Sequence, residues 1–201
     1  MPSYRAFHAR STAHIPDRWT VFEILFIAFL TFSGIGWIYE TFNEIIVLGV
    51  GFHPRAYLIG PWCPVYGIGS LIVLAFFWKL SICEVRVGRV NLSPALVTVG
   101  IFALTTAVEL VCSYVLQAFS GSFPWTYAGY WGNFEGRIAP EFSLRFTIAG
   151  LLGIYLLYPW LRLRISRMGT RARNTLFWTL ALLFAGDIVG EFSGVWTLLF
   201  R

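Results

Sequence analysis

Six ionisable side chains lie within long apolar stretches of this sequence, where charge is costly. An ionised group near the centre of a membrane-spanning helix costs about 2.5–3.5 kcal/mol on insertion scales. Such residues usually face the interior of a helix bundle and mark ion, proton or substrate sites. The six residues are Glu40, Glu44, Glu109, Arg145, Asp187 and Glu191. They are the first candidates for chemistry in this chain.

The spacing of these residues places them on shared helix faces. Glu40 and Glu44 are four residues apart, as are Asp187 and Glu191, so each pair lies on one face of a helix. Glu109 shares a face with the polar residue four positions later, Ser113. At a rise of about 1.5 Å per residue, charges on four spans fall between the membrane midplane and roughly 10 Å outward. We therefore predict one acidic layer in the outer half of the membrane.

The charge balance of this layer leaves two interpretations open. Closely spaced carboxylates in a medium of low dielectric constant cannot all be ionised, so some must be protonated or neutralised. Arg55, Arg137 and Arg145 are the outer-side arginines that could balance them. Buried ion pairs that only hold helices together are the structural alternative. The carboxylates outnumber these arginines, which favours a site for a proton, a cation or a polar substrate. Glu23 and Glu141 lie near span ends, where they could reach the interface or cap a helix.

The composition indicates that a membrane positions these residues. Hydrophobic residues make up 57% and charged residues 12% of the 201 residues, against about 25% charged in soluble domains. Five apolar stretches are close to, or longer than, the roughly 20 residues that a transmembrane helix needs. They cover about residues 20–48, 64–80, 94–119, 141–163 and 174–200. We predict an all-α integral membrane protein, a single bundle of five transmembrane helices at 19–201 after a basic cytoplasmic tail at 1–18.

Basic residues alternate between the gaps that separate the five spans. The tail and the gaps at 79–93 and 164–173 each carry several Lys or Arg, whereas the gaps at 49–63 and 120–140 carry one arginine each. Under the positive-inside rule, the basic gaps are cytoplasmic. The N-terminus is therefore predicted to be cytoplasmic and the C-terminus outside.

The two outer gaps contain segments rich in Gly, Pro and aromatic residues. Residues 55–70 read RAYLIGPWCPVYGIGS, and residues 121–140 read GSFPWTYAGYWGNFEGRIAP. Gly and Pro interrupt regular structure, whereas Trp and Tyr favour the membrane interface. We predict two ordered loops over the outer end of the bundle. Plain aromatic anchoring in the interface is the alternative.

Several function classes lack their sequence signatures here. The chain contains no P-loop motif and neither the HExxH nor the GxSxG pattern, so it carries none of the ATPase, zinc-protease or serine-hydrolase signatures. Its three histidines, His8, His14 and His53, do not support a metal site. The basic residues follow the pattern of membrane orientation rather than of nucleic-acid binding. We predict no cofactor, no metal and no nucleic-acid partner.

An ordered set of motifs resembles a bacterial family, the type IV ABC-transporter permeases. The set begins with Gly36-Trp37-x-x-Glu40, Arg55 and Gly60-Pro61-x-Cys63-Pro64-x-Tyr66-Gly67-x-Gly69. It continues with Glu109-x-x-x-Ser113, Trp125-x-Tyr127 and Asn133-x-x-Gly136-Arg137-Ile138. The resemblance covers about residues 30–160. It implies a multi-pass protein of the bacterial cytoplasmic (inner) membrane that is permease-like.

These observations together predict a transport-related membrane protein with an acidic polar cavity in the outer half of the membrane. Its predicted binding residues are Glu40, Glu44, Arg55, Cys63, Tyr66, Glu109, Ser113, Trp125, Tyr127, Asn133, Arg137, Arg145, Asp187 and Glu191. One alternative is a membrane-embedded enzyme on a lipid or lipid-linked substrate, with a buried carboxylate as general acid or base. Another is a non-catalytic subunit or assembly factor. The predicted partners are the bilayer, further copies of the chain, and an ATPase or other membrane subunit.

Overall fold

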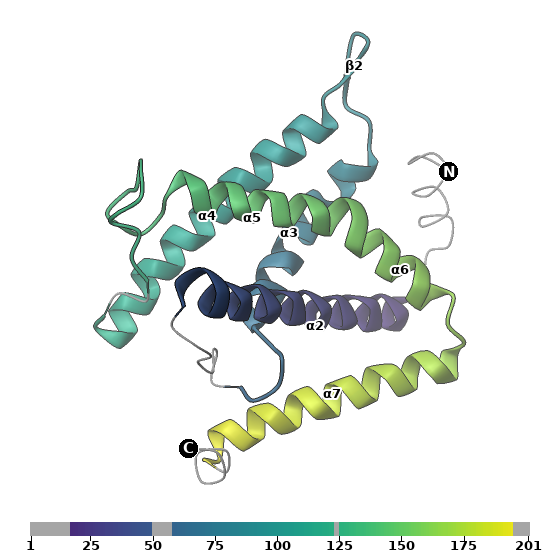
Figure 1. Cartoon of the computed structure of the whole chain (residues 1–201). Coiled ribbons are helices and arrows are strands. Elements are labelled where there is room, and N and C mark those ends of the chain that lie inside the picture. The colour runs from purple at the N-terminus through teal and green to yellow at the C-terminus, as the bar shows by residue number, and fades with distance from the viewer. Residues whose placement is uncertain (1–16, 50–57, 123–124, 195–201) are drawn as a thin grey trace. The chain divides into compact units, whose positions relative to one another are not determined.

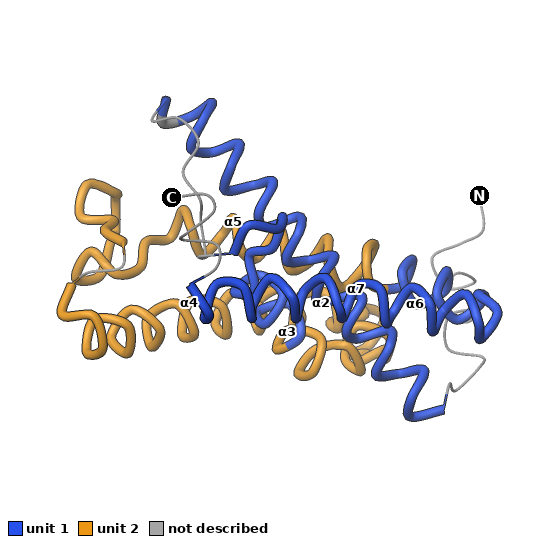
Figure 2. The backbone as a smooth tube through the Cα atoms, turned by 90° about the horizontal axis from the view of Figure 1, so that it is seen from below, with its two compact units in different colours: residues 1–71, 159–201 blue, residues 72–158 orange. Residues whose placement is uncertain are grey.

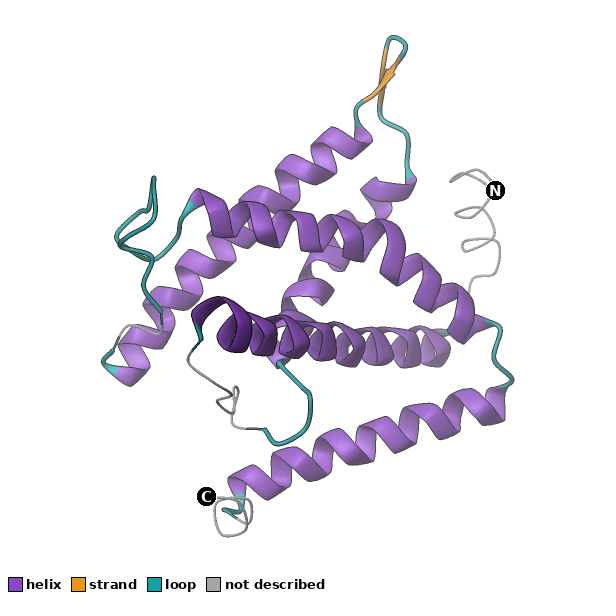
Figure 3. Cartoon of the chain, in the orientation of Figure 1, coloured by secondary structure: helices purple, strands orange, loops and turns teal. Residues whose placement is uncertain are grey.

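The computed structural model describes residues 17–49, 58–122 and 125–194. In these ranges the regular structure is helical except for one short two-stranded hairpin (Figure 3). The elements, labelled as in Figure 1, are α2 (Arg18–Phe42), the π-helical turn η1 (Asn43–Leu48), α3 (Pro64–Ile82), β1 (Arg86–Val87), β2 (Val90–Asn91), α4 (Ser93–Ser120), α5 (Pro140–Leu152), the π-helical turn η2 (Gly153–Leu157), α6 (Tyr158–Ser166) and α7 (Thr170–Phe192).

Five of the described helices are long and apolar enough to cross a membrane, which confirms the predicted number of such helices. They cover Arg18–Val47, Pro64–Ile82, Ser93–Ser120, Pro140–Ser166 and Thr170–Phe192. The sequence placed the fifth span at 174–200, whereas α7 ends at Phe192. Gly194 adopts a left-handed backbone with φ of 74° and donates its N–H to the Glu191 carbonyl, which closes the last turn.

The chain divides into two compact units, coloured blue and orange in Figure 2. Unit 1 comprises Met1–Leu71 and Pro159–Arg201, and therefore contains α2, the start of α3 and α7. Unit 2 comprises Ile72–Tyr158, and contains the rest of α3, the hairpin, α4 and α5. Every contact described below lies within one of these units.

In unit 1, α2 packs against α7 through aromatic side chains. Trp19, Phe22 and Phe26 recur every three to four residues, so they share one face of α2. All three meet Phe177 of α7, edge-on for Phe26 with ring centroids 5.1 Å apart. Edge-to-face rings add roughly 0.5–1.5 kcal/mol beyond the area that they bury. The periodic aromatic residues thus fix the α2–α7 pair.

In unit 2, α4 packs against α5, and the loop between them carries the principal candidate site. The two helices approach closely at Gly150, where a Cβ atom would lie 2.8 Å from Cγ2 of the fully buried Ile101. Helix α4 ends at Ser120, and its C-cap residue Gly121 has φ of 71°. Helix α5 starts at Pro140, whose fixed φ suits a first helical turn. These two breaks set the length of the connecting loop.

Candidate functional site

The loop between α4 and α5 is folded by its own hydrogen bonds. The Asn133 side-chain oxygen accepts the Gly136 N–H at 3.0 Å, and its amide nitrogen donates to two loop carbonyls. The Tyr127 N–H donates to the Gly136 carbonyl at 2.7 Å. The indole N–H of Trp125 donates to the Arg137 carbonyl at 2.9 Å. Trp125 and Asn133, predicted as binding residues, therefore shape the loop that positions Arg137.

Two successive residues of this turn have a left-handed backbone. Gly136 has φ of 67°, which glycine adopts readily. Glu135 has φ of 53°, a conformation that costs a residue with a Cβ atom about 1–2 kcal/mol. The turn therefore holds Glu135 in a strained conformation two residues before Arg137.

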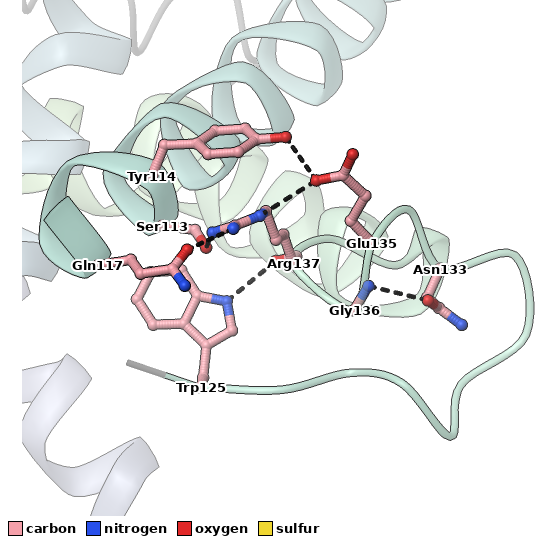
Figure 4. Close-up of polar contacts among 8 residues, drawn as sticks. All are labelled: Ser113, Tyr114, Gln117, Trp125, Asn133, Glu135, Gly136 and Arg137. Atoms are coloured by element: carbon pink, nitrogen blue, oxygen red, sulfur yellow. Dashed lines mark hydrogen bonds and ion pairs between the residues drawn. The ribbon is translucent and has the colours of Figure 1, made fainter. Parts of the chain in front are cut away.

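The Arg137 guanidinium group lies against the last two turns of α4 (Figure 4). The residue is only 7% exposed. It donates to the Ser113 hydroxyl at 2.9 Å and to the side-chain oxygen of Gln117. Its Cζ atom lies 3.9 Å from the centre of the Tyr114 ring. Its Nε donates to a Glu135 carboxylate oxygen at 3.3 Å. Neutral groups on α4 thus orient the cation, and a loop carboxylate contacts it.

Glu135 remains largely open to solvent, with 53% of its side chain exposed. Its carboxylate also accepts the Tyr114 hydroxyl at 2.6 Å. The hydrogen bond from Tyr114, followed by the hydrogen bond and charge of Arg137, holds the pKa of Glu135 below its usual range. Glu135 is therefore a carboxylate at neutral pH, and it lies at the surface beside a buried arginine.

Glu109 lies on α4 one turn before Ser113 and is 8% exposed. Its Oε1 accepts the Tyr127 hydroxyl at 2.9 Å. The Tyr127 ring stacks on Phe142 of α5, with centroids 4.0 Å apart and an interplanar angle of 11°. The other oxygen, Oε2, has no hydrogen-bond partner among the described residues. Glu109 is thus a buried carboxyl group with one satisfied and one unsatisfied oxygen.

A cavity of about 100 Å³ lies between α4, the loop and the start of α5. Its lining is mostly apolar and contains no acidic residue. The lining residues are Phe102, Thr106, Gly132, Ile138, Ala139, Pro140 and Ser143. The acidic cavity that the sequence predicts is therefore not this one, and it stays a prediction.

In unit 1, two predicted acids contact the segment that precedes and begins α3. The Asp187 carboxylate accepts the backbone N–H groups of Ile59 at 3.1 Å and of Gly60 at 2.8 Å. Glu40 accepts the hydroxyl of Tyr66. These carboxylates tie residues 58–70 to α2 and α7.

The remaining candidates of unit 1 occupy different environments. Cys63 is buried, and its N–H donates to the Ser33 carbonyl at 3.0 Å. Glu44 is buried in η1, whereas Glu191 is half-buried one turn after Asp187 on α7. Arg55 lies outside the described residues.

Arg145 belongs to unit 2 and forms an exposed ion pair with Glu141, four residues earlier on α5. The predicted site residues therefore divide between the units. Glu40, Glu44, Cys63, Tyr66, Asp187 and Glu191 lie in unit 1, whereas Glu109, Ser113, Trp125, Tyr127, Asn133, Arg137 and Arg145 lie in unit 2. A shared layer across both units stays a prediction.

Sequence reasoning missed two features. The expectation that Glu23 reaches the interface or caps α2 is wrong, because Asp17 is the N-cap and Glu23 is fully buried against Arg173, with Nε to Oε2 at 2.5 Å. It also missed three residues that contact Arg137, namely Tyr114, Gln117 and Glu135. Gln117 was detectable, because it lies four residues after Ser113 and shares its helix face.

In the described ranges, no three His, Cys, Asp or Glu side chains gather closely enough to hold a metal ion. The candidate site in unit 2 consists of the carboxyl groups of Glu109 and Glu135 and the buried guanidinium group of Arg137. The arrangement can bind a proton or a cation at Glu109 and an anion at Arg137.

The helices and their polar sites define the class of a multi-span helical membrane protein. The particular family follows from comparison with known proteins. The model of the family described as "Putative ABC-transporter type IV" matches residues 27–192, and the chain belongs to this family. The comparisons with curated proteins and with solved structures found no match.

Proposed function

We propose that this protein is a transport-related membrane subunit that binds a proton or a cation at Glu109. The observation that carries the proposal is the state of the buried Glu109 carboxyl group. One oxygen accepts the Tyr127 hydroxyl, and the other has no partner within the described part of the chain. An ionised carboxylate in a membrane span is costly, so this group must hold a proton or meet a cation.

The neighbours of Glu109 favour an exchangeable ligand over a fixed ion pair. The hydrogen bond that Glu109 accepts comes from a neutral hydroxyl, which can bond to the carboxyl group in either protonation state. Arg137, which approaches the same face of α4, donates to Ser113, Gln117 and Glu135. The charge of Glu109 can therefore change without breaking a salt bridge.

In this proposal the protein works within an ABC-transporter-related assembly, as its family description suggests. We place the segment at 58–70 and the loop at 125–139 on the outer side of the membrane, as the charge pattern predicts. The bonds from Tyr66 to Glu40, and from the Ile59 and Gly60 amides to Asp187, connect the first segment to acids. These bonds hold the first segment against α2 and α7.

Infrared difference spectroscopy of the full-length protein in liposomes tests the proposal. The wild type is compared with Glu109→Gln and with Glu141→Gln, which removes the same charge from an exposed site in the same unit. We expect wild type and Glu141→Gln to show a carboxylic-acid band that changes with pH or with added Na⁺ or K⁺. This response should be lost in Glu109→Gln.

Tyr127→Phe provides a second measurement, because it removes the hydrogen bond to Glu109 without removing the carboxyl group. We expect the carboxylic-acid band to persist at a shifted frequency. If Glu109→Gln folds normally and keeps the full pH and cation response, Glu109 is not the binding group. The proposal is then wrong, and the non-catalytic subunit becomes the better interpretation.

A further inference from the structure

The Arg137 guanidinium group is held in place mainly by groups that carry no charge. Ser113 and Gln117 accept its NH1 and NH2 hydrogen bonds, and the Tyr114 ring lies beneath its Cζ atom at 3.9 Å. These contacts orient the planar group but leave its positive charge in place, because arginine stays protonated in proteins. A cation that is 7% exposed is stable only with an anion beside it.

One anionic group that contacts Arg137 is the Glu135 carboxylate, and this contact is long. The distance from Nε to the carboxylate oxygen is 3.3 Å, whereas charge-assisted bonds of this type are usually about 2.7–2.9 Å. The bond is formed by one nitrogen, not by the two-nitrogen fork that arginine offers to carboxylates and phosphates. Glu135 is also half exposed and has a left-handed backbone. Such a carboxylate can be displaced by an anion that also takes over its hydrogen bond from the Tyr114 hydroxyl.

The position of the cluster in the sequence of elements points to the kind of anion. Ser113, Tyr114 and Gln117 lie in the last two turns of α4, which ends at Ser120. A helix of this length reaches the end of the hydrocarbon core, where the polar headgroups begin. Phosphate groups of lipids lie at this depth, and soluble anions reach it from the water.

We propose that Arg137 is an anion-binding site for a phosphate group and that Glu135 is an internal carboxylate that occupies the site when no ligand is bound. The phosphate would take the place of the Glu135 carboxylate and accept hydrogen bonds from Arg137 and the Tyr114 hydroxyl. Ser113 and Gln117 keep the guanidinium group oriented for this exchange. The site is separate from the one at Glu109, and its test does not depend on that proposal.

Thermal unfolding of the full-length protein in maltoside micelles provides the test. Sodium phosphate is titrated against sodium chloride of equal ionic strength, for wild type, Glu135→Gln and Glu141→Gln. Removing the internal competitor should raise the apparent affinity for phosphate by roughly tenfold, the equivalent of one charge-assisted hydrogen bond. Glu141→Gln is the matched control, because it removes an exposed carboxylate from Arg145, and it should behave as wild type.

A second arm of the experiment identifies the source of the phosphate. The same three proteins are measured in mixed micelles with phosphatidylglycerol, and with diacylglycerol as a control that lacks the phosphate. A larger response of Glu135→Gln to phosphatidylglycerol alone indicates a lipid headgroup. A larger response to inorganic phosphate indicates a free anion, and both outcomes support the site.

The proposal is overturned if Glu135→Gln and Glu141→Gln respond equally to phosphate and to phosphatidylglycerol. Arg137→Lys gives a further measurement, since lysine keeps the charge but lacks the fork. We expect its phosphate response to fall by roughly tenfold or more relative to wild type. If this variant does not fold, the two glutamate variants still decide the outcome.

Discussion

Each unit contains a buried arginine, and the two arginines meet their carboxylates in opposite ways. In unit 1, Arg173 pairs at 2.5 Å with Glu23, which is 0% exposed. When the Asn174 amide is oriented with its nitrogen toward the pair, this nitrogen lies 2.7 Å from the second Glu23 oxygen and donates to it. In unit 2, Arg137 meets Glu135 at 3.3 Å, and that carboxylate is 53% exposed. The first pair is sealed, with its carboxylate buried between helices. The second pair is open, because its carboxylate is exposed to solvent.

In our proposal, this difference separates a structural charge from an exchangeable one. Glu23 and Arg173 satisfy each other within the packed contact of α2 and α7, so neither group is available to a ligand. Arg137 is oriented by the neutral groups Ser113 and Gln117, and its anionic partner is a strained surface residue. Burial of an arginine alone therefore does not indicate its role. The exposure and geometry of its carboxylate do.

The largest effect should come from breaking the sealed pair. Glu23→Gln leaves the Arg173 charge buried without its carboxylate, and we expect a loss of about 3–5 kcal/mol in the free energy of unfolding. Chemical unfolding of the purified protein in detergent measures this loss. The double variant Glu23→Gln with Arg173→Met should recover much of it, because it removes the unpaired charge. Equal stability of Glu23→Gln and wild type would show that the Glu23–Arg173 pair does not stabilise the fold.

A smaller effect should follow from altering the turn that places Arg137. Gly136→Ala introduces a Cβ atom at φ of 67°, and we expect a loss of about 1–2 kcal/mol in unfolding free energy. Gly129→Ala, in the same loop with an ordinary φ and open space around it, is the matched control and should be near neutral. The Arg173 pair needs no such turn. If both alanine variants are equally stable, the turn does not determine the position of Arg137.

The smallest effect should be a pH dependence that belongs to the open pair. Tyr114 and Arg137 lower the pKa of Glu135 in the folded protein relative to its ordinary value of 4.5. A lowered pKa stabilises the fold above the ordinary value, and this contribution is lost as the pH falls through the folded value. Wild type should therefore lose slightly more stability than Glu135→Gln as the pH falls from 4.5 through the pKa of Glu135 in the folded protein. Parallel stability curves of the two proteins would contradict the prediction.

The candidate residues could be identified in the sequence, but their partners could not. Glu109 and Arg137 were identified because a charge in an apolar span and an arginine in a Gly-rich and aromatic loop are both conspicuous in sequence. That Tyr127 bonds to Glu109, and that Arg137 bonds to Ser113, was not predicted. Each bond joins a residue of the loop to a residue of α4, so it depends on the conformation of the loop.

The sequence by itself determined the five apolar helices, the family and the residues with unusual charge, because hydropathy and motif order are local properties of the chain. Only the tertiary structure decided which charges are sealed and which are open. Glu23 and Arg173 are 150 residues apart, and no local pattern links them. Their contact depends on the packing of α2 on α7, just as the openness of Glu135 depends on a left-handed turn that its own residue type disfavours.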